Sequence, residues 1–207
     1  MERSVEESWN LITGWLEQHL PAAHQALEPP ASPAAVEAVR EAVGRPLPPD
    51  LLAWLNLSDG IKQATVFGNL LPPFYSPLAC EHMLSRYRMM RHVYADMPAE
   101  DADKPAGSYS FVWLDSFVPL AASGTDVDLF VDLRDGDLHG CIDELDATEG
   151  SSGPLWPSTA VMLSQVADAF VLGKPIEQVY RSGDTDEYLP CVEDGRLSWQ
   201  PPADRCL

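Results

Sequence analysis

Apolar residues at helical spacing dominate the first half of the chain. They recur every three or four positions over about residues 4–20, which predicts an amphipathic N-terminal helix. Ser4 and Glu7 stand at the spacing of a capping box at the start of this run, and Pro21 ends it. Because the helix contains Trp9 and Trp15, we expect it to dock on the body of the domain.

The same periodicity predicts four more helices, over about residues 33–43, 50–57, 78–97 and 159–172. Ser32 is an N-cap residue before the first of these, and Gly44 stands where a C-cap glycine is expected. Gly173 ends the last one in the same way. The helix over residues 78–97 also contains the one cluster of basic residues in the chain, Arg86, Arg88, Arg91 and His92. These side chains either pair with the protein's own carboxylates or contact an acidic spot on a partner.

Strand patterns follow in the second half. Apolar or alternating runs cover residues 109–121, 127–133 and 138–142. Asp135-Gly136 separates the last two runs and favours a tight hairpin, because glycine accepts the positive φ that such a turn needs. A C-terminal hairpin is predicted over about residues 186–200, around Asp194-Gly195.

Helices therefore come first, strands follow, and a helix and a hairpin end the chain. This order predicts an α+β fold, with a central antiparallel-rich mixed sheet flanked by helices, and argues against a doubly wound fold. The polar, proline-bearing residues 98–108 indicate an exposed loop or insertion. We expect residues 1–207 to form a single domain.

Charge narrows the classes of partner. Thirty-two acidic residues against thirteen basic ones give a formal net charge of −19. Such a chain repels nucleic acid and anionic membrane surfaces, so we expect neither as a partner. A negative field instead steers basic proteins toward the molecule. The alternative is that the acidity only keeps the protein soluble.

Cysteines and the N-terminus bear on the compartment. No apolar stretch approaches the roughly eighteen residues that span a bilayer, and the acidic N-terminus lacks the pattern of a secretory signal. We therefore expect a cytoplasmic protein. The cysteines lie far apart at positions 80, 141, 191 and 206, which favours free buried thiols over a disulfide framework or a zinc site.

No catalytic pattern is present in the sequence. The five histidines have no nucleophile motif beside them, and the thirteen glycines stand singly instead of forming a phosphate-binding loop. The spacing of Asp126 and Asp128 fails the calcium-loop pattern, because Phe130 stands where a further ligand is needed. We expect no enzyme activity, no cofactor and no metal.

Two short signatures resemble the SMI1/KNR4 family, also called the SUKH superfamily. The first comprises the helix before Gly44, then Leu47-Pro48-Pro49-Asp50-Leu51, Trp54 and the Asp59-Gly60 turn. The second comprises Val118-Pro119-Leu120-Ala121, the turn from Gly124 to Asp128, the strand Leu129-Phe130-Val131-Asp132-Leu133, Asp135-Gly136 and the late helix near residues 159–172. The resemblance covers about residues 5–200 in order. Two positions depart from the family pattern, Val127 where glycine is common and Ile61 after the first turn.

This resemblance implies a SUKH-like fold and a binding scaffold instead of an enzyme. Bacterial members are regarded mostly as immunity proteins that neutralise toxins by binding them, and fungal members regulate cell wall assembly. The leading hypothesis for this chain is an immunity protein. The alternative is a regulatory scaffold similar to the fungal cell-wall synthesis regulator, because the N-terminal helix and the C-terminal hairpin resemble its longer members.

Residues 126–149 are the candidate partner-binding segment. They contain nine acidic side chains and a single basic one, Arg134. We expect a negative surface here that meets a protein partner, such as a basic toxin, and the alternative is an ordinary solvated sheet face. The candidate partner-binding residues are Asp126, Asp128, Asp132, Asp135, Asp137 and, at the first turn, Asp59.

Overall fold

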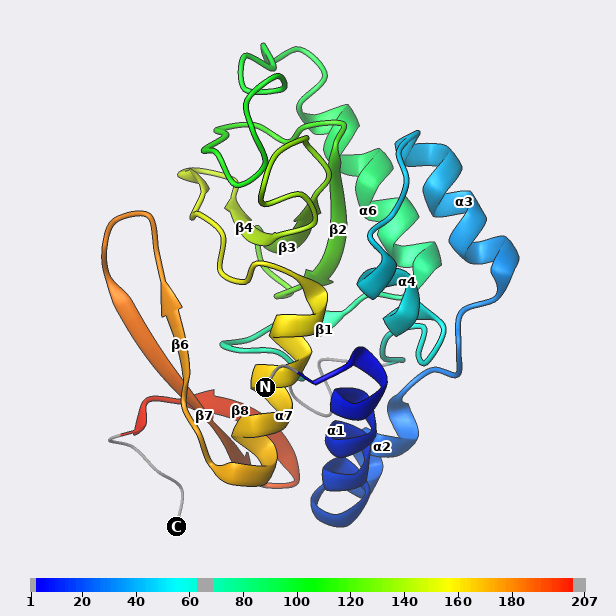
Figure 1. Cartoon of the computed structure of the whole chain (residues 1–207), viewed down its shortest axis with the longest axis vertical. Coiled ribbons are helices and arrows are strands. Elements are labelled where there is room, and N and C mark those ends of the chain that lie inside the picture. Colours follow the sequence, from blue (N-terminus) through cyan, green and yellow to red (C-terminus); the bar gives the residue numbers. More distant parts are fainter. Residues whose placement is uncertain (1–2, 63–68, 203–207) are drawn as a thin grey trace.

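The computed structural model describes residues 3–62 and 69–202 (Figure 1). Its helices are α1 (Val5–His19), α2 (Pro21–Ala26), α3 (Pro33–Val43), α4 (Pro49–Leu55), α6 (Cys80–Val93) and α7 (Thr159–Leu172). The predicted capping box of α1 is confirmed, because Ser4 accepts from the Glu7 amide and the Glu7 carboxylate accepts from the Ser4 amide. Pro21 does more than end α1: it is also the first residue of α2, a helix that the periodicity did not reveal. No helix in the described part of the chain is long and apolar enough to cross a membrane.

The main sheet contains β1 (Ser76–Pro77), β2 (Phe117–Ala122), β3 (Val127–Asp132), β4 (Ile142–Asp146) and β5 (Gly150–Ser151). Its strands lie in chain order, and each pairs antiparallel with the next. The α+β class is confirmed, with antiparallel pairing at every named strand pair among the described residues.

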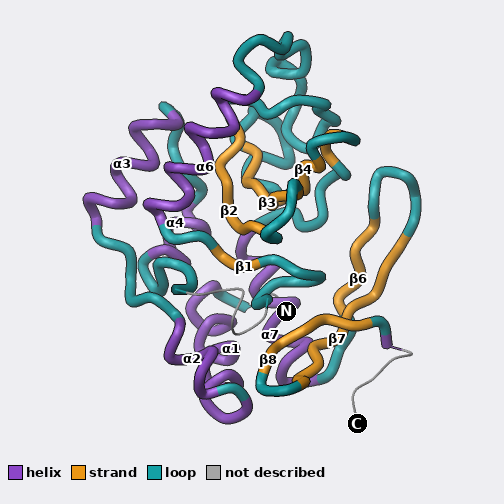
Figure 2. The backbone as a smooth tube through the Cα atoms, turned by 180° about the vertical axis from the view of Figure 1, so that it is seen from behind, coloured by secondary structure: helices purple, strands orange, loops and turns teal. Residues whose placement is uncertain are grey.

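A second sheet contains β6 (Ile176–Val179), β7 (Thr185–Glu193) and β8 (Arg196–Gln200), in that order. Asp194 and Gly195 form the turn between β7 and β8, with φ values of 51° and 73°, which is the conformation that a tight hairpin turn requires. This sheet lies beside α7 (Figure 2). Strand β6 was not predicted.

Helix α7 joins the N-terminal and C-terminal parts of the chain. The α1 face packs on α7, where Trp15 stacks on Phe170 with ring centroids 4.4 Å apart. Phe170 in turn stacks on Trp199 of β8 at 5.6 Å. One hydrophobic cluster thus extends from Val5 to Trp199.

The connection between β3 and β4 differs from the prediction. The expected tight hairpin at Asp135-Gly136 is wrong, because β3 ends at Asp132 and β4 begins only at Ile142. The physical reason is Arg134, whose side chain is 1% exposed and needs the longer loop to fold back into the interior. The predicted strand over residues 138–142 is displaced along the chain into β4 for the same reason.

The apolar run over residues 109–121 is a strand only in its second part. Residues 109–116 precede β2 as a loop, and Trp113 from this loop packs edge-on against Phe117 and Phe130. The run is therefore apolar because the loop itself is part of the core.

The cysteine prediction is correct only in part. Cys80 and Cys141 are buried and free, but Cys191 is disulfide-bonded. The expectation of a free thiol is wrong at that position. Cys206 lies outside the described residues.

Candidate partner-binding surface

The acidic segment from Asp126 to Glu149 contains both buried and exposed side chains. Asp128, Asp132 and Asp143 are buried, each at most 1% exposed, whereas Asp126, Asp135, Asp137 and Glu149 are exposed. We expected these carboxylates to form a negative surface that faces either a partner or solvent. That expectation is wrong for Asp128, Asp132 and Asp143, which lie inside the protein.

Asp132 and Arg134 form a fully buried ion pair. The Arg134 guanidinium donates to the carboxylate through Nε at 3.1 and 3.0 Å and through Nη2 at 2.6 Å. The amide of Gly107 also donates to Asp132 Oδ2, at 2.9 Å. Arg134 further donates to the carbonyl oxygens of Asp101 and Ser108. This pair therefore holds the loop over residues 98–108 against the end of β3. The contacts that attach the loop to the sheet are made on the buried side of the loop.

Asp128 forms an ion pair with Arg86 of helix α6. Arg86 donates to Asp128 Oδ2 at 2.6 Å through Nε, and Arg91 makes a two-bond contact with Asp115. The prediction that the α6 arginines pair with the protein's own carboxylates is thus confirmed for these two. Burial raises the pKa of Asp128, although Arg86 opposes the shift.

Asp143 forms no ion pair with a basic side chain among the described residues. Its Oδ1 accepts from the Glu144 amide at 2.7 Å, while Oδ2 is buried without a hydrogen-bond partner among the described residues. Burial raises the pKa of this carboxyl to about 7, and the Glu144 amide and the Arg181 charge only partly oppose the shift. The pKa shift follows from desolvation of the charged form.

The exposed aspartates lie at opposite ends of β3. Asp126 precedes the strand, and Asp135 and Asp137 follow it, so a strand length of roughly 20 Å separates them. Asp59 lies elsewhere, at the start of α6, where its carboxylate accepts from the Cys80 amide at 2.7 Å. The structure therefore does not bring the predicted site residues into one patch.

A hollow of about 490 Å³ lies between β5 and the β6–β7 hairpin, and we call it the acidic cleft. Its charged lining comprises Glu144, Glu149, Asp184, Asp186 and Arg181. Arg181 is exposed, and it stacks over Tyr109 and donates to the Gly107 carbonyl. The Ala147 amide donates to the Asp126 carbonyl, so Asp126 lies near Glu149. The sequence did not reveal the cleft because Asp184 and Asp186 are far from Glu149 along the chain.

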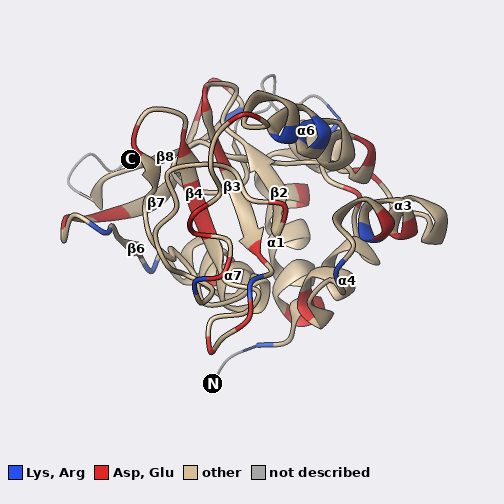
Figure 3. Cartoon of the chain, turned by 90° about the horizontal axis from the view of Figure 1, so that it is seen from above, with Lys and Arg blue, Asp and Glu red and all other residues tan. Residues whose placement is uncertain are grey.

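Acidic residues are spread over much of the molecule, while the basic residues of α6 lie together (Figure 3). Figure 3 shows acidic residues along β4, β7 and the neighbouring loops, while α6 presents basic residues. Among the described residues no three His, Cys, Asp or Glu side chains lie together as possible metal ligands. His19 and His139 each make a local contact with a backbone carbonyl, that of Trp15 and that of Arg134.

These features define an α+β protein with an antiparallel five-stranded sheet, helices packed beside it and acidic groups at the strand ends. The chain belongs to the SMI1 / KNR4 family (SUKH-1), whose model matches residues 30–165. The match begins before α3 and ends within α7, so α1, α2 and the second sheet lie outside it. No curated protein matches the chain.

Proposed function

We propose that this protein is a non-enzymatic, cytoplasmic binding module that neutralises a toxin by covering its surface, as an immunity protein does. The observation that carries the proposal is membership of the SMI1 / KNR4 family (SUKH-1) combined with a net charge of −19. A chain of this charge attracts a basic polypeptide over long range and repels nucleic acid. The proposal treats residues 1–207 as one domain, because a single core cluster extends from Val5 to Trp199.

The acidic cleft, together with Asp126, is the surface that best suits a basic partner. Four carboxylates line or flank it with exposed charge, namely Asp126, Glu149, Asp184 and Asp186. The lining contains four carboxylates, Glu144, Glu149, Asp184 and Asp186, against one basic residue, Arg181. Lysine or arginine side chains of a partner would therefore meet a concave, negatively charged surface. Asp135 and Asp137 form a second, smaller acidic group at the other end of β3.

The test is a capture experiment with the tagged full chain in lysate of its own cells, followed by association kinetics with the purified partner. We expect one basic polypeptide that binds at low salt and is lost at high salt, because screening weakens steered association. A variant with Asp126→Asn, Glu149→Gln, Asp184→Asn and Asp186→Asn should associate at least about tenfold more slowly.

The matched control removes four exposed carboxylates elsewhere, through Glu17→Gln, Glu41→Gln, Glu100→Gln and Asp103→Asn. Both variants have the same net charge, so only position differs. Equal slowing in both would show that net charge, and not the acidic cleft, governs association. A partner that is acidic, or a bound partner that salt does not release, would contradict the proposal.

The alternative function is a regulatory scaffold. It is favoured by α1 and the second sheet, which lie outside the matched residues 30–165 and pack on α7. Capture of several signalling or wall-synthesis proteins, insensitive to salt and lost when α1 is altered, would support this alternative.

A further inference from the structure

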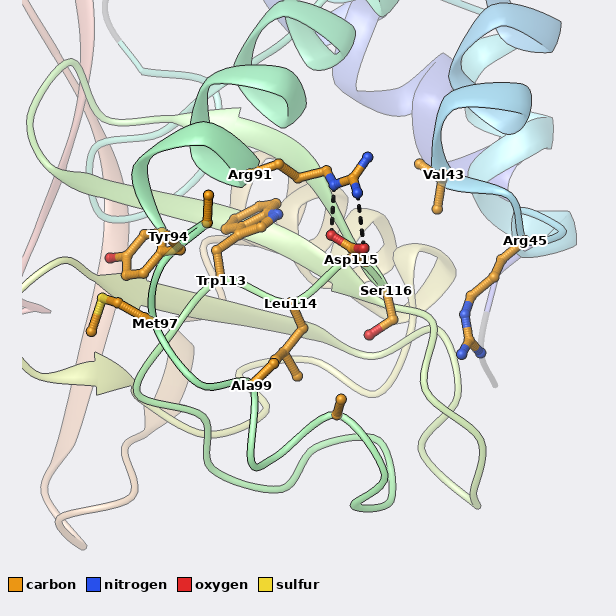
Figure 4. A pocket seen from close by; sticks show the side chains of 12 residues that line it. Val43, Arg45, Arg91, Tyr94, Met97, Ala99, Trp113, Leu114, Asp115 and Ser116 are labelled. Atoms are coloured by element: carbon orange, nitrogen blue, oxygen red, sulfur yellow. Dashed lines mark hydrogen bonds and ion pairs between the residues drawn. The ribbon is translucent and has the colours of Figure 1, made fainter.

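A second hollow, of about 430 Å³, lies beside the C-terminal end of α6 (Figure 4). It opens between the C-terminal end of α6, the loop that follows it and the residues after α3. Arg45, Arg91, Met97, Trp113 and Ser116 are among the residues that line it. We call it the donor hollow, because its polar lining consists mostly of hydrogen-bond donors.

Trp113 supplies an unused donor. The residue is 4% exposed, and its Nε1–H has no hydrogen-bond partner among the described residues. Its ring is held edge-on against Phe117 and Phe130, with centroids 5.7 Å away from each, so it has little freedom to turn toward another acceptor. In Figure 4 the nitrogen-bearing edge of the ring lies on the side of the Arg91–Asp115 pair. A buried donor without an acceptor is unfavourable, and a ligand oxygen in the hollow would supply the missing acceptor.

The charges in the hollow favour an anion. Arg91 binds Asp115 through Nε at 2.6 Å and Nη2 at 3.1 Å, so these two charges offset each other. Arg45 donates to the Leu133 carbonyl at 3.0 Å, and its positive charge has no carboxylate partner in the lining. The side chains that line the hollow thus carry one net positive charge, while Asp96 and Glu100 are exposed in the loop that forms one of its edges.

Three exposed apolar side chains form a stripe over the end of α6 and the loop that follows it. Met89, Val93 and Met97 are spaced four residues apart and are 41%, 61% and 39% exposed. Met89 and Val93 lie one turn apart on one face of α6, which ends at Val93, and Met97 follows in the loop after the helix and lines the hollow. A ligand that fills the hollow can therefore continue over apolar surface, which suits a polypeptide better than a small molecule.

We propose that the donor hollow and the Met89–Val93–Met97 stripe bind an acidic, apolar segment of a partner protein. An aspartate or glutamate carboxylate of that segment enters the hollow, accepts the Trp113 indole N–H and faces Arg45, while neighbouring apolar side chains cover the stripe. The partner chemistry is opposite to that expected at the acidic cleft. The proposal is therefore independent of toxin neutralisation and gives the protein a second binding surface.

The first experiment uses two small probes of the same shape, 3-phenylpropionate and 3-phenylpropanamide, with the ¹⁵N-labelled full chain. The six tryptophans give separate indole N–H signals, and Trp113→Phe identifies the one from residue 113. We expect a saturable shift of that signal with the carboxylate and none with the amide. Arg45→Gln should weaken carboxylate binding about tenfold, because a charge-assisted contact is lost.

Arg40→Gln is the matched control, since Arg40 is an exposed arginine of α3 that pairs with Glu37 and is not in the lining. It should bind the carboxylate as the unchanged protein does. No saturable shift at residue 113, an equal shift with the amide, or an equal loss in both arginine variants would overturn the anion site.

The second experiment distinguishes a protein segment from a small carboxylate. A helical peptide with glutamate and leucine on one face is compared with its glutamine version, by fluorescence anisotropy. We expect the glutamate peptide to bind at least about tenfold more tightly than 3-phenylpropionate, and Met89→Ser with Val93→Ser to abolish that gain while leaving the small probe unaffected. If the double variant leaves peptide affinity unchanged, or the peptide binds no better than the small probe, docking of a protein segment is wrong.

Discussion

Three aspartates occupy one buried face of the main sheet, and each is accommodated differently. Asp128 and Asp132 are each two residues from Phe130 along β3, so their side chains lie on the same face of the sheet as Phe130. Asp143 lies directly opposite Phe130 on β4, so its side chain is on that face too. Asp132 has a buried arginine, Asp128 has a partly exposed one, and Asp143 has backbone contacts alone. The free-energy cost of burying the carboxylate charge should therefore be smallest for Asp132, larger for Asp128 and largest for Asp143.

Asp143→Asn should stabilise the protein above neutral pH. Burial raises the pKa of this carboxyl to about 7 in the folded protein, against 3.8 for an unperturbed aspartate. The folded state thus retains a proton that the unfolded state has lost between these two values, and wild-type stability falls as pH rises through this window. We expect the asparagine variant to gain on the order of a few kcal/mol at pH 8 and much less at pH 5.

Thermal unfolding followed by circular dichroism between pH 5 and pH 8 tests this expectation. Asp126→Asn serves as the control, because Asp126 is exposed and its replacement should leave the slope of Tm against pH unchanged. A variant that is less stable than the wild type at pH 8 would mean that the Asp143 charge is compensated in the folded protein.

Removing the Arg134 guanidinium should destabilise the protein more than removing that of Arg86. Arg134→Met leaves Asp132 buried without its cation, which costs about 3–5 kcal/mol. Arg86→Met should cost less, because Arg86 is 27% exposed and water can reach the site. Urea denaturation of both variants measures the difference in free energy of unfolding, and Asp132→Asn combined with Arg134→Met should recover part of the loss. Equal costs for the two single variants would contradict this ranking.

At the scale of elements, α1 is joined to the body of the protein through aromatic residues. Trp9 packs edge-on against Trp54 of α4 at 5.7 Å and is 5% exposed. Trp15 stacks on Phe170 of α7 at 4.4 Å but is only partly buried. Both contacts join segments that are distant in the chain, so α1 is part of the core instead of an appendage.

Trp9→Ala should therefore cost about 3–5 kcal/mol, the range for a large aromatic residue removed from a core. Trp15→Ala should cost clearly less, since part of its ring is already in contact with water. Chemical denaturation with a dye that binds exposed apolar surface measures both effects. If Trp9→Ala is as mild as Trp15→Ala, the packing of α1 on α4 contributes little to stability.

Local signals made most helices predictable from the sequence. Ser4 with Glu7, Ser32 with Gly44, and Ser158 with Gly173 fix helix ends through contacts within a few residues. The β3–β4 connection was not predictable, because it depends on Arg134 reaching carbonyls of Asp101 and Ser108. Strand β6 was missed because it is short and half exposed, and only pairing with β7 defines it.

The candidate site was less predictable than the fold. Charge alone identified the acidic segment but not which of its members are buried, because burial of a residue such as Asp132 depends on contacts with distant segments, here the Gly107 amide. The acidic cleft and the donor hollow each combine residues from distant parts of the chain, such as Glu149 with Asp186 and Arg45 with Trp113. No spacing rule reveals such pairs.

At the scale of the whole molecule, a net charge of −19 should weaken the folded state through self-repulsion. Salt screens this repulsion, because the Debye length falls from about 30 Å at 0.01 M to about 8 Å at 0.15 M. We expect Tm at pH 7.5 to rise by several degrees when sodium chloride is raised over this range. Calorimetry measures the change.

The control is a variant with Asp135→Asn and Asp137→Asn, in which two exposed charges on one loop are removed. Its Tm at low salt should be higher than that of the wild type, and its response to salt should be smaller. A Tm that falls on adding salt would mean that attractive pairs such as Arg86–Asp128 outweigh the repulsion.

The Asp59-Gly60 turn has a bearing on how variants of this protein are interpreted. Gly60 has φ 77°, and a β-carbon there would lie 2.6 Å from the backbone of Leu78 and Ala79, directly beside the amide that Asp59 caps. Any side chain at position 60 must therefore displace the start of α6. Since α6 ends at the donor hollow, a mutational scan would score Gly60 as a binding residue although it contacts no ligand. Helix content and Tm must therefore be measured together with binding for each variant. These measurements distinguish residues that act indirectly through α6 from residues that contact the ligand.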